Sequence, residues 1–384
     1  MPREIITLQC GQCGNQIGCR FWDLALREHA SHNTNATFDH ALSSFFRNVD
    51  TRHSPPLELP TGTGNSPIRS LKARAVLIDM EEGVIKQLIS GHLGDLFDTK
   101  QYITGNSGSG NNWAQGHEVY GPEYADDILG KIRKQVELCD SLQSFVMLHS
   151  LGGGTGSGVG SYIVELLHDA YPQVYQFSTS IFPSVDDDVV TSPYNSLLAT
   201  VALAEYADCV LPIENQALLD ILSQKENTRG KHSIAKGKVK GDKPFDSMNG
   251  IAANLLLHLT SSMRFEGSLN VDLNEITTNL VPYPKLHFLV SSMAPHSAFS
   301  HSGSAAQQHR AINQLFTEVF MRDNQLIKVD PTRSTYLACA LLMRGNGCTI
   351  SDLHQNVARI KHRLTMVSLP HPTKSFRGSL LCGT

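Results

Sequence analysis

A glycine-rich segment, GGGTGSG at residues 152–158, constrains this chain more than any other feature. It follows an apolar run at residues 145–149 and precedes apolar residues that recur at helical spacing from Val159 to Leu167. A strand that ends in glycines and re-enters a helix offers bare backbone N–H groups and a positive helix end to an anion. The segment therefore predicts a phosphate-binding turn. It lacks the lysine-containing P-loop spacing and fits the dinucleotide GxGxxG pattern only loosely.

The composition is that of an ordinary globular protein. Among its 384 residues, 41% are hydrophobic and 18% are charged, and no apolar run approaches the ~18 residues that a membrane span requires. The N-terminus lacks the apolar stretch of a secretory signal, so we expect a cytoplasmic protein whose eight cysteines are mostly thiols. Cys10 and Cys13 have no second ligand pair, which argues against zinc. A net charge of −4 argues against nucleic-acid binding.

Strand-like runs alternate with helical patterns, which predicts an α/β fold with a doubly wound, mostly parallel sheet. The expected strands lie at residues 5–8, 73–78, 144–149, 175–182 and 209–213. A first helix is expected near residues 15–29. A long helix from Phe245 is apolar on all sides, which favours burial between two domains.

Beyond that helix, residues 285–291 and 336–343 read as strands of a second, smaller sheet. Residues 31–70 and 224–243 read as surface loops, and the second of these carries seven Lys and Arg residues. It is either a solvated loop or a binding site for an acidic partner. We expect a nucleotide-binding domain at residues 1–244, a linking helix at 245–264 and a second domain, incomplete at its C-terminus, at 265–384.

Two further glycine-bearing turns accompany the first. GQCGNQ at residues 11–16 follows the first expected strand, and GSGNNW at residues 108–113 adds N–H donors and two carboxamides. Ligands of open α/β sheets gather at the carboxyl ends of the strands. With residues 152–158, these turns closely resemble, in the same order, the phosphate loops of the tubulin family.

The resemblance covers almost the whole chain. The segments at residues 74–79, 192–195, 264–273, 279–284 and 286–288 are all similar to tubulin landmarks. Within the family the chain looks most like the epsilon class, on the segments at residues 21–29, 44–52 and 97–100 and on the basic insert before Pro244. This resemblance implies a cytoskeletal role at the centrosome, centriole or basal body, with other tubulin subunits and centriolar proteins as partners.

The resemblance also implies a GTP or GDP site with Mg²⁺. The residues that match its phosphate, ribose and base contacts are Gly11, Gln12, Cys13, Gln16, Gly110, Asn111, Gly153, Gly154, Thr155, Gly156, Ser192, Asn215, Phe245 and Asn249. Asp79 and Glu81 match the acids near the magnesium. Asn215 and Asn249 match the residues that recognise guanine, and Phe245 matches the ring that stacks on it. Without the resemblance, Phe245 reads as a core aromatic.

One departure lies at the ribose. Where tubulins usually have a glutamate before Pro-Tyr-Asn, this chain has Thr191 and Ser192, with one extra residue in the loop. Hydroxyl groups can also bond a sugar, so Ser192 remains the predicted contact.

Asp272 and Glu275 match the loop that in tubulins completes the nucleotide site of the adjacent subunit. Glu275 matches the acid that triggers hydrolysis in alpha-type subunits, since a carboxylate can orient the attacking water. The same segment also reads as an N-capped helix start with acids at its positive end, and both roles are compatible.

The chain stops at Thr384, where tubulins continue through further helices. We therefore expect exposed apolar surface on the long central helix and the second sheet. The predicted function is GTP binding within a microtubule structure, with hydrolysis completed by a neighbouring subunit. A scaffold that holds GTP without turnover is an alternative. A remote alternative, an NAD-dependent oxidoreductase, would need an acid about 20 residues after its glycine turn, and Asp169 comes too early for that role.

Overall fold

The computed structural model describes residues 3–61, 66–184, 187, 189–230, 244–265, 270–295, 305–330, 334–344, 349–362, 364–366 and 378–381. Its centre is a six-stranded parallel sheet in the order β11-β10-β9-β1-β7-β8. These strands are β1 (Glu4–Cys10), β7 (Ala75–Asp79), β8 (Tyr102–Thr104), β9 (Leu142–Ser150), β10 (Tyr175–Phe182) and β11 (Cys209–Glu214). The predicted α/β fold is confirmed, and β8 is a strand that the sequence pattern did not predict.

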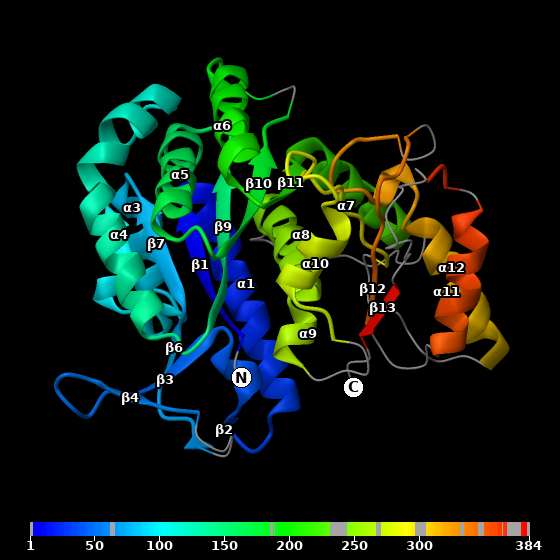
Figure 1. Ribbon diagram of the computed structural model, residues 1–384, viewed down its shortest axis with the longest axis horizontal. Helices are drawn as coiled ribbons and strands as arrows, with labels where there is room; N and C mark the ends of the chain where they lie inside the picture. Colours follow the sequence, from blue (N-terminus) through cyan, green and yellow to red (C-terminus); the bar gives the residue numbers. More distant parts are fainter. Residues whose placement is uncertain are drawn as a thin grey trace.

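Helices cover both faces of this sheet (Figure 1). One face carries α1 (Gly11–His32), α3 (Glu82–Ile89), α7 (Asn215–Gly230) and α8 (Pro244–Leu259), and the other carries α4 (Gly121–Glu137), α5 (Gly160–Ala170) and α6 (Ser192–Tyr206). Successive side chains of a strand point to opposite faces. Leu148 accordingly packs in the core beneath α1 and α8, while its neighbour Met147 packs beneath α5 and α6.

The strand order places the site. β1 pairs with β7 on one side and with β9 on the other, so the chain reverses its direction of winding beside β1. In open α/β sheets this switch point is where ligands bind. The turns that follow β1 and β9 are two of the three segments predicted to hold phosphate.

Residues 31–70, predicted as a surface loop, are partly a core element. β3 (Phe46–Asp50) is buried throughout and pairs with β4 (Leu57–Leu59) and β6 (Leu71–Ala73). The remaining short elements are α2 (His40–Ser43) and the pair β2 (Thr37–Phe38) and β5 (Ser66–Pro67). The loop prediction is wrong here because the segment is buried by a distant contact, the edge-on packing of Phe46 against Trp22 of α1.

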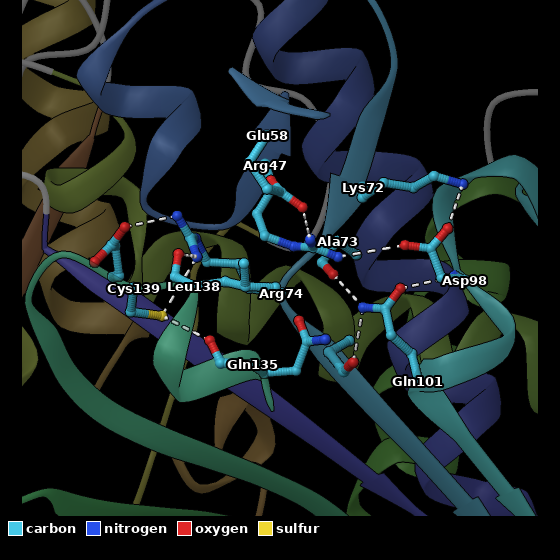
Figure 2. Close-up of polar contacts among 12 residues, drawn as sticks. Arg47, Glu58, Lys72, Ala73, Arg74, Asp98, Gln101, Gln135, Leu138 and Cys139 are labelled. Carbon is cyan, nitrogen blue, oxygen red and sulfur yellow. Dashed lines mark hydrogen bonds and ion pairs between the residues drawn. The ribbon is translucent and has the colours of Figure 1, made fainter. Parts of the chain in front are cut away.

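An ion-pair network attaches this part to the main sheet, as Figure 2 shows. Arg47 of β3 pairs with Glu58 of β4 and, at 3.4 Å, with Asp98, which also lies 3.0 Å from the Lys72 ammonium. Arg47 and Asp98 belong to two of the segments on which the epsilon-class resemblance rests. The network therefore joins segments that are far apart in the sequence.

The second part of the chain lies beyond α8. Within the described residues its sheet consists of β12 (Leu341–Arg344) and β13 (Gly378–Leu381), which are parallel. Near them lie α11 (Ala305–Glu318) and α12 (Ile350–Lys361), whereas α10 (Leu273–Leu280) packs into the core of the first sheet through Leu273 and Ile276. A small core joins α11, β12 and α12 through Phe316, Leu341, Leu353 and Ile360.

Three predictions about these segments need correction. Residues 285–291 do not join the second sheet, because Phe288 bridges Val210 at the edge of the first sheet. The linking helix is interrupted at Thr260, between α8 and α9 (Ser261–Arg264). The basic loop predicted at residues 224–243 begins as the end of α7, and residues 231–243 lie outside the described part of the chain.

The two parts of the chain meet at a charged cluster. The Glu28 carboxylate, near the end of α1, lies 2.7 Å from the buried Arg264 guanidinium and 2.9 Å from that of Arg344 in β12. Burial alone would raise the pKa of Glu28, but the two guanidinium groups lower it below its ordinary value. Both guanidinium groups also lie over the ring of Phe265.

The expected exposure of the central helix is wrong. Met248, Ile251 and Leu256 of α8 are buried. Phe245, at the start of this helix, is exposed. Another four exposed apolar side chains lie on α6, and they are Tyr194, Leu197, Leu198 and Val201.

Candidate nucleotide site

Three glycine-bearing turns meet at the carboxyl edge of the sheet. A Cβ atom on Gly11, which has a φ of +72°, would lie 3.1 Å from the backbone nitrogen of Gly156. A Cβ atom on Gly154 would lie 2.7 Å from the backbone nitrogen of Asn112. The turns thus contact one another through their backbones, which only glycine permits. Residues Thr155–Val159 form a wide π-helical turn before α5, a feature that recurs at functional sites.

Polar side chains join these turns. The hydroxyl groups of Ser109 and Thr155 lie 2.7 Å apart. The Asn195 amide of α6 donates to the carbonyl groups of Asn111 at 2.8 Å and Gly152 at 2.9 Å. Asn195 is not among the predicted site residues. It belongs to a recognised tubulin segment, but only the tertiary structure shows that it ties two turns together.

A cavity of about 1730 Å³ opens between the three turns and the start of α8. This volume exceeds the ~300–1,000 Å³ typical of small-molecule sites, so a nucleotide fits. The predicted residues that line it are Gly11, Gln12, Cys13, Gln16, Asp79, Glu81, Gly110, Asn111, Gly153, Gly154, Thr155, Gly156, Asn215, Phe245 and Asn249. Segments from across the sequence thus converge on one cavity.

The two acids lie at its wall. Asp79 ends β7, and burial raises its pKa to about 6. One of its carboxylate oxygens is buried with no hydrogen-bond partner among the described residues. The Glu81 carboxylate lies close to Gly108, in the second turn. An unpartnered buried carboxylate oxygen is a ligand that a hard cation would satisfy. Within the described ranges, no group of three or more His, Cys, Asp or Glu residues is arranged so that it could hold a metal ion.

Residues of α7 and α8 also line the cavity. Asn215 begins α7 directly after β11, and Asn249 lies on α8. The Phe245 side chain is 60% exposed and lines the cavity, so it is not a core aromatic. These three residues offer two carboxamides and an open ring face.

The predicted ribose contact is arranged differently from the others. Ser192 is buried and donates to the Asp187 carboxylate at 2.8 Å, while the Thr191 hydroxyl donates to the Asn111 carbonyl at 2.7 Å. Asp187 lines the cavity, but Ser192 does not. The group presented at this wall is therefore the carboxylate of Asp187, which the sequence did not single out.

Asp272 and Glu275 lie outside this cavity, at the start of α10. The Asp272 side chain caps the helix by accepting from the Glu275 N–H at 2.8 Å, so the predicted N-cap is confirmed. Arg3 pairs with Asp272 at 3.2 Å.

Comparison with known proteins decides the family. The family model for the Tubulin/FtsZ family, GTPase domain, matches residues 4–223, and that for the Tubulin C-terminal domain matches residues 284–380. The chain belongs to the tubulin family. Membership of this family implies GTP binding.

Among tubulins, the chain is similar to the tubulin epsilon chains of Homo sapiens and Mus musculus. It is 54% identical to each over 383 residues, which cover 95% of this chain and 78% of each relative. Identity to the tubulin beta-1 chain of Chondrus crispus is 35%, over 91% of this chain and 72% of that protein. The predicted epsilon-class likeness is confirmed.

In the parts of the chain that the structure describes, no helix has both the length and the apolar composition needed to cross a bilayer.

Proposed function

We propose that the cavity binds GTP or GDP. The observation that carries this proposal is the convergence on one cavity of residues from three glycine turns, of two acids, and of Asn215, Phe245 and Asn249. The backbone N–H groups at the start of α1 and α5 would hold the phosphates. Asn215 and Asn249 would recognise guanine, and Phe245 would stack on it.

Nucleotide preference tests this proposal. Adenine presents a different edge, and a mismatched buried donor or acceptor costs roughly 1–3 kcal/mol, so GTP should bind about tenfold more tightly than ATP or better. The measurement is calorimetric titration of the purified full chain with both nucleotides. Asn249→Ala should remove most of the preference, whereas Asn279→Ala, at an exposed position of α10 that does not line the cavity, should keep it. Equal affinities of the wild-type chain for ATP and GTP would contradict the proposal.

Mg²⁺ belongs to the same proposal. Asp79 and Glu81 would hold it, directly or through water, beside the phosphates. The ion would neutralise phosphate charge, and it would also give the buried, unpartnered Asp79 oxygen a partner. Omitting magnesium should therefore weaken GTP binding to the wild-type chain more than to Asp79→Asn.

We further propose that the protein acts in a microtubule-based structure of the centriole or basal body, with other tubulin subunits as partners. The support is the similarity to the epsilon chains. Glu275, which lies outside this chain's own cavity, would act on the nucleotide of the subunit that docks against α10. A scaffold that holds GTP without turnover is distinguished by measuring phosphate release after a partner tubulin is added.

A further inference from the structure

His149 is a fully buried histidine beneath the phosphate turn. It lies near the end of β9 and its side chain has 0% exposure. Its Nδ1 lies 2.7 Å from the carbonyl oxygen of Gly156. Its Nε2 lies 2.8 Å from the Ser178 hydroxyl and 3.2 Å from that of Ser180, both in β10. The imidazole therefore bridges a strand of the central sheet and the turn that lines the cavity.

These partners fix the proton of the ring. A carbonyl oxygen only accepts, so Nδ1 carries the hydrogen and donates it to Gly156. Nε2 then accepts from a serine hydroxyl, and the Ser178 and Ser180 hydroxyls lie 2.7 Å from each other. Burial lowers the pKa of His149 to about 4, so the ring is neutral at pH 7. Both nitrogens are satisfied in this one tautomer.

The hydrogen bond from His149 to the Gly156 carbonyl orients the peptide group between Gly156 and Ser157. In a trans peptide the carbonyl of one residue and the N–H of the next point in opposite directions. Holding the Gly156 carbonyl toward His149 thus directs the N–H of Ser157 toward the N-terminal end of the turn, where Gly153 and Gly154 line the cavity. Gly160 leaves the space for the ring, since a Cβ atom there would lie 2.8 Å from Nδ1.

We propose that His149 is a positioning residue for phosphate binding, which holds the turn at residues 155–159 in its anion-binding conformation without touching the nucleotide. This inference rests on the proposed binding of guanine nucleotides. It adds that binding of the phosphates depends on His149, whereas binding of the guanine base does not.

Two isosteric variants of the full chain test the proposal. The amide nitrogen of Asn can stand close to the position of Nδ1 and still donate to Gly156. The amide of Gln extends to the position of Nε2, so it contacts the serines but loses Gly156. We expect His149→Gln and His149→Ala to weaken GDP binding about tenfold or more, and His149→Asn to stay within a few-fold of the wild type. Ser178→Ala is the control, because it leaves the bond to Gly156 in place.

Guanosine, which has no phosphate, separates positioning from general destabilisation. Its affinity, measured by the same calorimetric titration, should change less than about twofold in every variant that keeps a cooperative thermal transition. Equal losses of guanosine and GDP affinity, or equal GDP affinities of the Asn and Gln variants, would overturn the positioning role. If the wild-type chain itself binds neither GDP nor guanosine, the proposed function fails, and this inference fails with it.

Discussion

The side chain of Asp272 accepts a hydrogen bond from the backbone N–H of Glu275 at 2.8 Å, which closes the first turn of α10. Removing an N-cap side chain costs about 1 kcal/mol. Asp272→Ala should therefore lower the free energy of unfolding by about this amount, with a further small loss from the exposed pair with Arg3. Thermal melts of the purified chain measure it, and Asp272→Asn, which keeps the cap, should recover most of the loss.

Glu275→Ala should leave nucleotide binding by this chain unchanged, because Glu275 lies outside the cavity. Turnover by a mixed assembly should fall about 10²-fold or more, the usual effect of losing a positioned acid–base group. The measurement is phosphate release from a partner tubulin's GTP with wild type or variant added. Unchanged release despite demonstrated co-assembly would falsify the catalytic role.

Gly154→Val should abolish nucleotide binding. Even a Cβ atom at this position would lie 2.7 Å from both the Asn112 nitrogen and the Ser109 Cβ, so the second and third turns must separate. Titration with GTP measures the effect. Gly130→Ala is the control, since a Cβ there meets nothing within 4 Å and alanine should stabilise the middle of α4 by roughly 0.5–1 kcal/mol. Tight GTP binding by Gly154→Val would mean that the turns tolerate separation.

Glu28→Gln should destabilise the chain in a pH-dependent way. Arg264 and Arg344 lower the native pKa of Glu28. The Glu28 carboxylate therefore stabilises the folded chain above its unfolded pKa of about 4.3, and this stabilisation is lost as the pH falls through the native pKa. At pH 7 the variant leaves the buried Arg264 without a charged partner, which costs about 3 kcal/mol.

Urea unfolding at pH 7 and at pH 3 measures this difference, which should shrink at the lower pH. The exposed Glu123→Gln in α4 should change stability by less than about 0.5 kcal/mol at both values. A Glu28→Gln effect of the same size at pH 3 and pH 7 would show that packing, not charge, is responsible.

The sequence by itself determined five of the six strands of the central sheet and the positions of the glycine-bearing turns. The apolar runs at residues 144–149 and 175–182 are long and bounded by turn residues, so local periodicity identified β9 and β10. The glycines at residues 152–158 marked the turn because close backbone approach requires glycine. Residue-by-residue resemblance then supplied Asn215 and Asn249, which no local pattern distinguishes from other asparagines.

Only the tertiary structure decided what depends on partners distant in the sequence. Phe46 is buried because Trp22 packs against it, although its segment reads as a loop. Phe288 bridges Val210 of the first sheet, although its segment reads as a strand of the second sheet. Asp187 lies at the cavity wall, where it accepts a hydrogen bond from Ser192. His149 lies beneath the turn, where it hydrogen-bonds with Gly156 and Ser178. A local sequence pattern shows which side chains are apolar. A hydrogen bond between distant residues also depends on whether the folded backbone brings the donor and the acceptor together.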